Sequence, residues 1–410
     1  MKQFTSIYKL SFYIITLITF VFGGLIQYFL GISNTVITAL LMALLYYNYF
    51  LYAILKKRVV FNAVVFWSIC YFLIIILSAI INQSKLILTS VYFIFAALPL
   101  GVYLFCFINY KEKIIPINYI YKLFYYISIL QLPILLIQRN FYESLIQFNN
   151  SGQLIDWYDF MFGTFFIKSD HSLAIFVLFS IIIILTKNKD KLFKHPIISI
   201  FYLSITVFLA ESTISKFFLC LILSASIIIP FYDKYKDYLS FKIGTVILAV
   251  SLALIAYNLR EQDFIKRRLG GQFEHQYSIE VSERRYESKT AKRGQILIVL
   301  FNKIPVKGIG DGPYSYFNIL TGKFTNTKHF TQIIWTYFDL GLTGIVVFFG
   351  ILISLISYLN IQRGIFFYIF LSAFVVYSFY TTIYSDIAIL FSLLMIFNKK
   401  KNEFNYHPIS

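Results

Sequence analysis

A single histidine marks the place where the chain returns from its longest hydrophilic stretch to an apolar run. His329 follows a segment rich in lysine and arginine and stands immediately before the apolar run 330–358. A helix starting here would favour bound anions and an uncharged imidazole at its N-terminal end. An uncharged imidazole can accept a proton at neutral pH, as a general base must. We interpret His329 as a candidate catalytic base; the alternative is a structural histidine at a helix start.

Three glycines alternate with other residues shortly before this histidine, in the segment Pro305-Val306-Lys307-Gly308-Ile309-Gly310-Asp311-Gly312. Alternating glycines allow positive φ angles and a close approach of the backbone to a ligand. The pattern is weak evidence for a phosphate loop because no strand–helix context surrounds it. A turn by which the chain re-enters the membrane explains it equally well. Lys307, Gly308 and Gly310 are candidate substrate contacts, and Tyr314 is a candidate for stacking on a sugar.

Cations that could hold a phosphate lie in the same hydrophilic stretch. Arg284, Arg285 and Arg293 each carry a planar guanidinium that can bind a phosphate through two parallel hydrogen bonds. For any one of them, a solvated loop or general contact with lipid head groups is the favoured explanation. Lys216, in the sequence AESTISKFF, lies close to hydrocarbon, where a charge costs roughly 2.5–3.5 kcal/mol at the helix centre. It is therefore a candidate site residue, unless it lies near a helix end and reaches the interface.

Other ionisable residues at apolar runs give weaker signals. Asp339 and Asp386 are favoured as structural residues, and His171 begins the sixth apolar run. The chain has no His-x-x-x-His, no cysteine pair, no Asp-x-Asp and no nucleotide-binding loop. We therefore expect neither a metal nor a cofactor, and any glycosyl or phosphoryl donor would have to be carried by a lipid.

The composition indicates what must position these residues. Of 410 residues, 59% are hydrophobic and only 13% are charged. A transmembrane helix needs about 20 apolar residues, which predicts an all-α polytopic membrane protein with a single integral membrane domain, 1–410. About twelve transmembrane helices are expected, at 10–30, 34–55, 60–81, 86–109, 118–138, 171–186, 196–211, 216–231, 242–258, 330–358, 365–381 and 384–398.

Lysine and arginine in the short loops predict the orientation of these helices. Both the N- and C-termini are expected in the cytoplasm, which leaves two segments on the outer, periplasmic face. The smaller is 139–170 and the larger is 259–329, between helices 9 and 10. The larger loop holds thirteen lysines and arginines against seven acidic residues, and it is expected to contain short amphipathic helices at the lipid surface. Such a basic loop indicates an anionic partner or contact with anionic lipid head groups.

Four features of this region resemble the O-antigen polymerase and O-antigen ligase superfamily of bacterial envelope enzymes. They are Arg293 at the head of an amphipathic segment, the Pro305–Gly310 turn, His329 opening a helix, and the sequence Asp339-Leu340-Gly341-Leu342-Thr343-Gly344. Three positions depart from the family pattern. Leu297 replaces a tryptophan, Phe330 replaces an asparagine, and Ser215-Lys216 replaces a Ser-Arg pair. The first leaves open which of Arg284, Arg285 and Arg293 is essential, and the last makes Lys216 the expected phosphate contact.

The resemblance implies an O-antigen polymerase in the bacterial inner membrane, with its active site on the periplasmic side. It would transfer the growing oligosaccharide from undecaprenyl pyrophosphate to the next lipid-linked repeat by metal-independent, inverting glycosyl transfer. Expected partners are the lipid-linked oligosaccharide and membrane lipids, with a chain-length regulator (a polysaccharide co-polymerase) and the flippase as further candidates, and no nucleic acid. The alternatives are an O-antigen ligase that uses lipid A-core as acceptor and, less favoured, a polysaccharide or lipid transporter.

Overall fold

The structure is a computed structural model, and it describes most of the apolar chain. The described residues are 2–157, 159–187, 192–210, 213–235, 238, 250–251, 278–288, 295–296, 298–299, 306–315, 331–359, 372, 375–378, 383–397 and 406–408. His329, Arg293 and most of the expected helices 242–258 and 365–381 lie outside them. Statements about the fold concern the described residues only.

Six helical stretches are long and apolar enough to cross a membrane, in agreement with the expected all-helical membrane protein. The first joins α1 (Lys2–Leu17), the π-helical turn η1 (Ile18–Phe22) and α2 (Gly23–Leu30). The others are α3 (Asn34–Lys56), α4 (Ala63–Ile81), α5 (Leu86–Glu112), α6 (Ile117–Asn140) and α17 (Gln332–Ser357). The number of twelve helices and their sidedness remain predictions.

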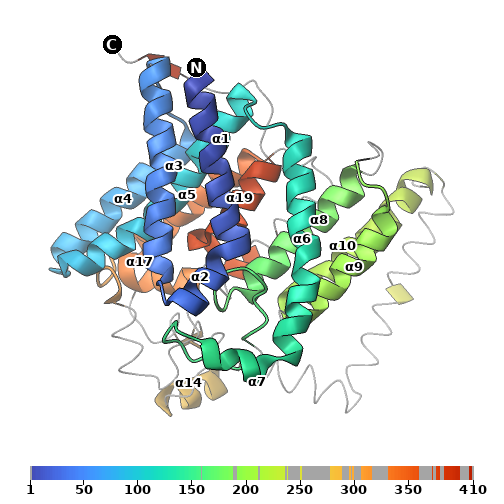
Figure 1. The fold of residues 1–410 in the computed structure, drawn as a ribbon. Helices are drawn as coiled ribbons and strands as arrows, with labels where there is room; N and C mark the ends of the chain where they lie inside the picture. The colour runs from blue at the N-terminus through green and yellow to red at the C-terminus, as the bar shows by residue number, and fades with distance from the viewer. Residues whose placement is uncertain are drawn as a thin grey trace.

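Shorter elements complete the described fold (Figure 1). The apolar helices are α8 (Asp170–Lys187), α9 (Pro196–Leu209), α10 (Thr213–Tyr235) and α19 (Ile387–Ile396). The remaining pieces are α7 (Tyr142–Leu145), η2 (Ile146–Phe148), α14 (Ile279–Glu287), η5 (Ile383–Ser385), β1 (Arg58–Val60) and β2 (Tyr406–Pro408). The antiparallel pairing of β1 with β2, which places Val59 opposite His407, was not expected from the sequence.

Both termini lie at the same end of the bundle (Figure 1). At this end the Phe4 and Tyr52 rings lie 6.0 Å apart, and Lys56 forms an ion pair of 3.1 Å with Glu112. The start of α1 and the ends of α3 and α5 therefore meet there. The opposite end carries the candidate site.

The packing is that of a bundle in lipid. Helix α5 is enclosed, since every residue from Ala96 to Asn109 is buried. Large apolar side chains on the outside of other helices are exposed, among them Leu40, Ile54, Ile80, Phe201 and Ile353. Such a surface would be unfavourable in water and is matched by hydrocarbon.

Candidate functional site

Helix α17 is broken at Gly341. This residue has φ 71° and ψ −162°, a conformation that L-residues with a side chain adopt only with strain. The break leaves the carbonyls of Phe338 and Asp339 and the amides of Leu342 and Thr343 without partners in their own helix. In apolar surroundings such groups must be satisfied by other parts of the protein.

Residues 306–315, which we call the glycine loop, satisfy all four groups. The amides of Asp311 and Gly312 donate to the carbonyls of Phe338 and Asp339 at 2.8 and 3.1 Å. In the other direction, the amides of Leu342 and Thr343 donate to the carbonyls of Lys307 and Gly308 at 2.9 and 3.1 Å. The two motifs that the sequence shows separately, the glycine turn and Asp339–Gly344, thus bind each other through their backbones.

Close backbone approach explains two of the glycines in this arrangement. A Cβ atom at Gly310 would lie 2.4 Å from the carbonyl carbon of Asp339 and 2.5 Å from the amide nitrogen of Leu340. A Cβ atom at Gly341 would lie 2.6 Å from the carbonyl oxygen of Gly308. At Gly308 itself no atom lies within 4 Å of such a Cβ. Gly310 is therefore needed for packing against α17, whereas Gly308 is open.

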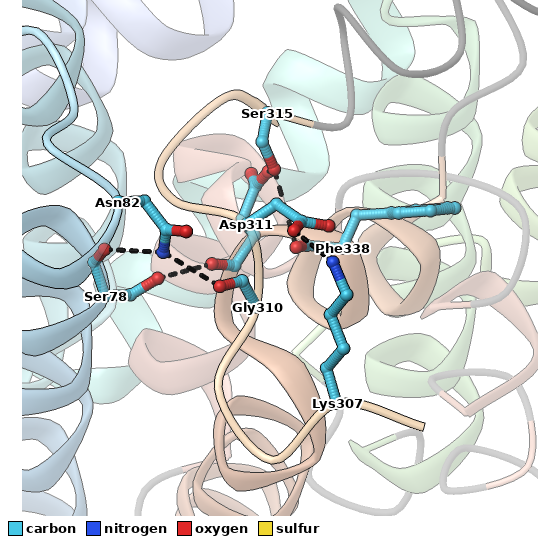
Figure 2. A network of polar contacts seen from close by, with 8 residues as sticks. Ser78, Asn82, Lys307, Gly310, Asp311, Ser315 and Phe338 are labelled. Carbon is cyan, nitrogen blue, oxygen red and sulfur yellow. Dashed lines mark hydrogen bonds and ion pairs between the residues drawn. The ribbon is translucent and has the colours of Figure 1, made fainter. Parts of the chain in front are cut away.

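The end of α4 holds the same junction from the other side (Figure 2). The Ser78 hydroxyl donates to the carbonyl of Asp339 at 2.7 Å. The Asn82 side-chain amide donates both to the carbonyl of Ser78, at 2.8 Å, and to the carbonyl of Gly310, at 2.9 Å. Because these groups are part-buried or buried, the glycine loop is held in a defined position at the end of the bundle.

The lysine of the loop already has an acidic partner. The Lys307 ammonium forms an ion pair with the carboxylate of Asp311, four residues later in the loop (Figure 2). Both side chains remain partly exposed, so the pair contributes little to stability. A phosphate that bound Lys307 would compete with Asp311 for it.

Tyr314, in the glycine loop, packs against the aromatic rings of Trp335 and Tyr92. The Tyr314 ring stacks on Trp335 in the first turns of α17, with centroids 5.9 Å apart and planes at 24°. Tyr92 of α5 meets both rings edge-on, at 5.3 and 5.2 Å. Burial, and secondarily the negative charge of Asp339, raise the pKa of Tyr314 well above its usual value. Tyr314 therefore presents a neutral hydroxyl near neutral pH.

A second non-helical segment enters the bundle beside α2, α6 and α8. Residues 159–169, which we call the inner segment, belong to the expected smaller outer loop, yet residues 160–167 are all buried. Three glutamines inside the apolar helices bind its backbone. Gln138 exchanges two hydrogen bonds with Gly163, at 2.8 and 2.9 Å. Gln131 accepts from the amide of Thr164 at 3.0 Å, and Gln27 accepts from the amide of Ile167 at 2.8 Å.

The glycine loop and the inner segment border a cavity of about 360 Å³. Its wall combines Phe166–Ser169 at the end of the inner segment, Tyr314 of the glycine loop and Trp335 of α17. The rest comes from helix starts, namely Asn34 and Thr38 of α3, His171 and Ser172 of α8, and Ser385–Ile387 before and in α19, with Phe95 of α5. The volume lies within the range of small-molecule sites, about 300–1,000 Å³.

Two residues of this wall have unusual backbones. Lys168 has φ 62° and Tyr314 has φ 60°, in the left-handed region that favours glycine. Each such residue costs on the order of 1–3 kcal/mol, and residues of this kind concentrate at ligand sites. By contrast, Lys57 and Lys113 adopt the same conformation as helix C-caps, where it is common. The strain at Lys168 and Tyr314 is a reason to assign a function to the cavity.

Asp386 and His171 lie next to each other in the cavity wall. The Asp386 carboxylate caps α19 by accepting the amide of Ile389 at 3.1 Å, and it also accepts the hydroxyl of Ser172. His171 lies close enough to this carboxylate to interact with it electrostatically. The pair offers both a hydrogen-bond donor and an acceptor to a bound molecule.

Lys216 lies close to this part of the wall through its neighbours. Ser215, directly before it, is hydrogen bonded to the Tyr377 hydroxyl. The Tyr377 ring meets the His171 ring edge-on, with centroids 6.0 Å apart. The structure therefore brings the start of α10, with Lys216, beside His171 at the candidate site.

The structure does not connect the other predicted residues with the cavity. Arg284 and Arg285 lie in α14, where Arg284 pairs with Glu280 at 3.0 Å and both of these side chains are exposed. Neither arginine is part of the cavity wall among the described residues. His329 and Arg293 lie outside the described residues. Within the described ranges, no three His, Cys, Asp or Glu side chains gather as a metal site would require.

Apart from Tyr314, the residues that line the cavity receive little weight from the sequence alone. His171 and Asp386 were noted only as residues at apolar runs, and Lys168 was not singled out. A signal was present in Lys168-Ser169-Asp170-His171-Ser172, a polar cluster immediately before an apolar run. Its partner Asp386 is more than 200 positions away in the sequence, so the spacing could not link them. Comparison with protein-family models, curated proteins and solved structures finds no match to this chain.

Proposed function

We propose that this chain is a membrane-embedded glycosyltransferase, and specifically an O-antigen polymerase. It transfers the growing oligosaccharide from undecaprenyl pyrophosphate to the next lipid-linked repeat unit, at the periplasmic face of the bacterial inner membrane. The O-antigen ligase reaction, with lipid A-core as acceptor, is the alternative that shares the donor. The altered Ser215-Lys216 and Leu297 positions favour the polymerase.

The cavity is the observation that carries the proposal. It lies at one end of an apolar bundle, beside the loop that holds the sequence motif, and its wall contains Tyr314, His171 and Asp386. A lipid-linked sugar needs such a place, because its polyprenyl chain stays among the helices while its sugar and pyrophosphate lie at the surface. The basic segment 259–329 supplies the cations that a pyrophosphate requires.

The residues have separate roles in this reaction. His329 removes the proton from the acceptor hydroxyl, whose oxygen then attacks the anomeric carbon of the donor. The bond from that carbon to the pyrophosphate oxygen breaks, and the undecaprenyl pyrophosphate leaves with the electron pair. Arg285, Arg293 and Lys216 stabilise the charge on the leaving group. Chemistry of this kind requires no nucleotide.

Purified protein incubated with the lipid-linked repeat tests the proposal directly. We expect a ladder of polymer lengths by gel electrophoresis. His329→Gln keeps hydrogen bonding but cannot act as a base, so its rate should fall about a hundred- to ten-thousandfold. Restored activity in His329→Gln would exclude the base role. His195→Gln is the matched control, because His195 directly precedes α9 and is not part of the cavity wall among the described residues.

The cation variants test the leaving-group contacts. Arg285→Ala, Arg293→Ala and Lys216→Ala should each lower the rate roughly a hundredfold, as the loss of a transition-state donor does. Arg293→Lys should not restore the full rate, because the guanidinium fork is lost. Normal polymer from all three alanine variants would make these residues lipid anchors only.

The surface polysaccharide of a deletion strain separates the related functions. A single repeat on lipid A-core indicates a polymerase, long lipid-linked chains indicate a ligase, and cytoplasmic accumulation indicates a transporter. The predicted sidedness is tested with single cysteines at Ser278 and Asn188 in a background without native cysteines. An impermeant thiol reagent should label them from opposite sides, and labelling from one side would contradict the topology.

A further inference from the structure

We propose that the cavity bounded by Lys168, His171, Tyr314, Trp335 and Asp386 binds the terminal sugar of the acceptor oligosaccharide. The inference rests on the proposed function and adds to it the place and the contacts of the acceptor. In this arrangement the sugar ring lies against Tyr314, and its hydroxyl groups are bound by Asp386 and His171. This binding does not require His329 or the candidate arginines Arg285 and Arg293.

The aromatic part of the wall suits the face of a sugar ring. Tyr314 and Trp335 are stacked at 5.9 Å, and Tyr92 supports both from the side. Both Tyr314 and Trp335 border the cavity. A pyranose presents carbon-bound hydrogens on its faces, and aromatic rings give such groups large contact area with little loss of conformational freedom.

The polar part of the wall suits hydroxyl groups. Asp386 accepts one hydrogen bond from Ser172 and one from the Ile389 amide, with the Ala388 amide also facing it. A carboxylate has about four acceptor positions, so at least one remains for a ligand hydroxyl. Hydroxyls and amides that both donate and accept, those of Asn34, Ser169 and Ser385, complete the wall.

The charge of the wall argues against the other two parts of the substrate. Among the described residues of the wall, Lys168 and Asp386 carry one formal charge each, of opposite sign. A pyrophosphate prefers clustered arginine forks and is repelled by a carboxylate. A polyprenyl chain needs an apolar wall, whereas charged and hydroxyl side chains occupy much of this one. A neutral, hydroxyl-rich ligand fits best.

The size of the cavity limits how much of the acceptor it holds. About 360 Å³ is near the lower end of the range for ligand sites. It accommodates the end of an oligosaccharide and not a long chain. The cavity therefore selects the terminal sugar of the acceptor, and the remainder extends out of the bundle.

Direct binding tests the inference without relying on turnover. The full-length protein with Trp67→Phe and Trp157→Phe keeps Trp335 as its only tryptophan, so its fluorescence reports on the cavity. The probe is the free repeat oligosaccharide, released from the host's lipid-linked repeat by mild acid. We expect a saturable fluorescence change, with affinity reduced about tenfold or more by Asp386→Asn and less by His171→Gln.

Matched variants separate binding from folding. Asparagine caps helices as well as aspartate does, so Asp386→Asn should keep α19 intact. Tyr314→Phe keeps the ring and should bind nearly as the parent does, whereas Tyr314→Leu should bind several-fold more weakly. Asp156→Asn and His195→Gln change the same residue types outside the cavity and should bind normally. Binding is compared only among variants whose melting temperature equals that of the parent protein.

Two outcomes would overturn the inference. One is the absence of any saturable change with the oligosaccharide in protein that makes polymer, which would leave the proposed function standing. The other is a change caused by inorganic pyrophosphate and not by the oligosaccharide, which would assign the cavity to the donor. If the oligosaccharide binds as expected but the wild-type protein makes no polymer, the proposed function fails and the sugar site stands.

Discussion

The glycine loop and the inner segment both bring non-helical backbone into the same end of the bundle, but their backbone groups are satisfied differently. The glycine loop pairs with the backbone of the broken helix α17, and this contact tolerates no side chain at Gly310 or Gly341. The inner segment pairs mainly with the side chains of Gln27, Gln131 and Gln138, with one backbone bond from the Gly24 amide to the Thr164 carbonyl.

The difference shows two solutions to one physical problem. Inside a membrane protein every backbone amide and carbonyl needs a partner, because water does not supply one. A backbone-to-backbone contact depends on the absence of side chains, whereas a side-chain contact depends on one residue type in an otherwise apolar helix. Added atoms should therefore disrupt the glycine loop, whereas the inner segment should also be disrupted by removing the polar atoms of its glutamines.

Gly310→Ala should have the largest effect. Its Cβ would meet backbone atoms of α17 at 2.4 and 2.5 Å, and neither backbone can move without losing the four loop bonds. We expect a loss of about 3 kcal/mol or more in the free energy of unfolding, measured by thermal unfolding in detergent. Gly308→Ala is the control, since its Cβ would meet nothing within 4 Å. Equal stability of the two variants would contradict the proposed contact.

Gln138→Leu should come next. The substitution leaves both the amide and the carbonyl of Gly163 without their present partner, at a cost of roughly 1–3 kcal/mol for each buried group. Thermal unfolding again measures the effect. Gln147→Leu changes the same residue type at an exposed position and should leave the melting temperature nearly unchanged. A stable Gln138→Leu protein would show that water or another side chain replaces the glutamine.

Asn82→Ala should have a smaller effect because it removes two hydrogen bonds without introducing a clash. Its amide joins the carbonyls of Ser78 and Gly310, and we expect a loss of about 1–2 kcal/mol. Since the loop carries Tyr314, oligosaccharide binding should weaken together with stability. Ser90→Ala, which removes one exposed bond within α5, is the comparison. Unchanged oligosaccharide binding would show that the Asn82 contact is not needed to position Tyr314.

Lys307→Met should change stability least. The ion pair with Asp311 is partly exposed and should contribute well under about 1 kcal/mol. The rate of polymerisation tests whether Lys307 contacts the pyrophosphate or only forms an ion pair with Asp311. If Lys307 contacts the pyrophosphate, Lys307→Met lowers the rate while Asp311→Asn, which releases the lysine, does not. Equal rates for both variants would reduce Lys307 to a partner of Asp311.

The helical membrane architecture and part of the site could be predicted from the sequence. Long apolar runs can satisfy their own backbone groups only as helices, and this fixed α1 to α6 and α17 in outline. The glycine spacing also identified a segment with close backbone contacts, although the contact found is with α17. The predicted roles of His329 and Arg293 remain predictions.

The contacts of the glycine loop and the inner segment could be known only from the three-dimensional fold. Gly310 lies against Asp339 because α17 breaks at Gly341, and glycine types alone do not say which backbone approaches. Likewise His171, Tyr314 and Asp386 come from three distant parts of the chain, and no spacing rule joins them. Helix packing brings their ends to one place, so the cavity is a property of the fold and could not be read from any one stretch of sequence.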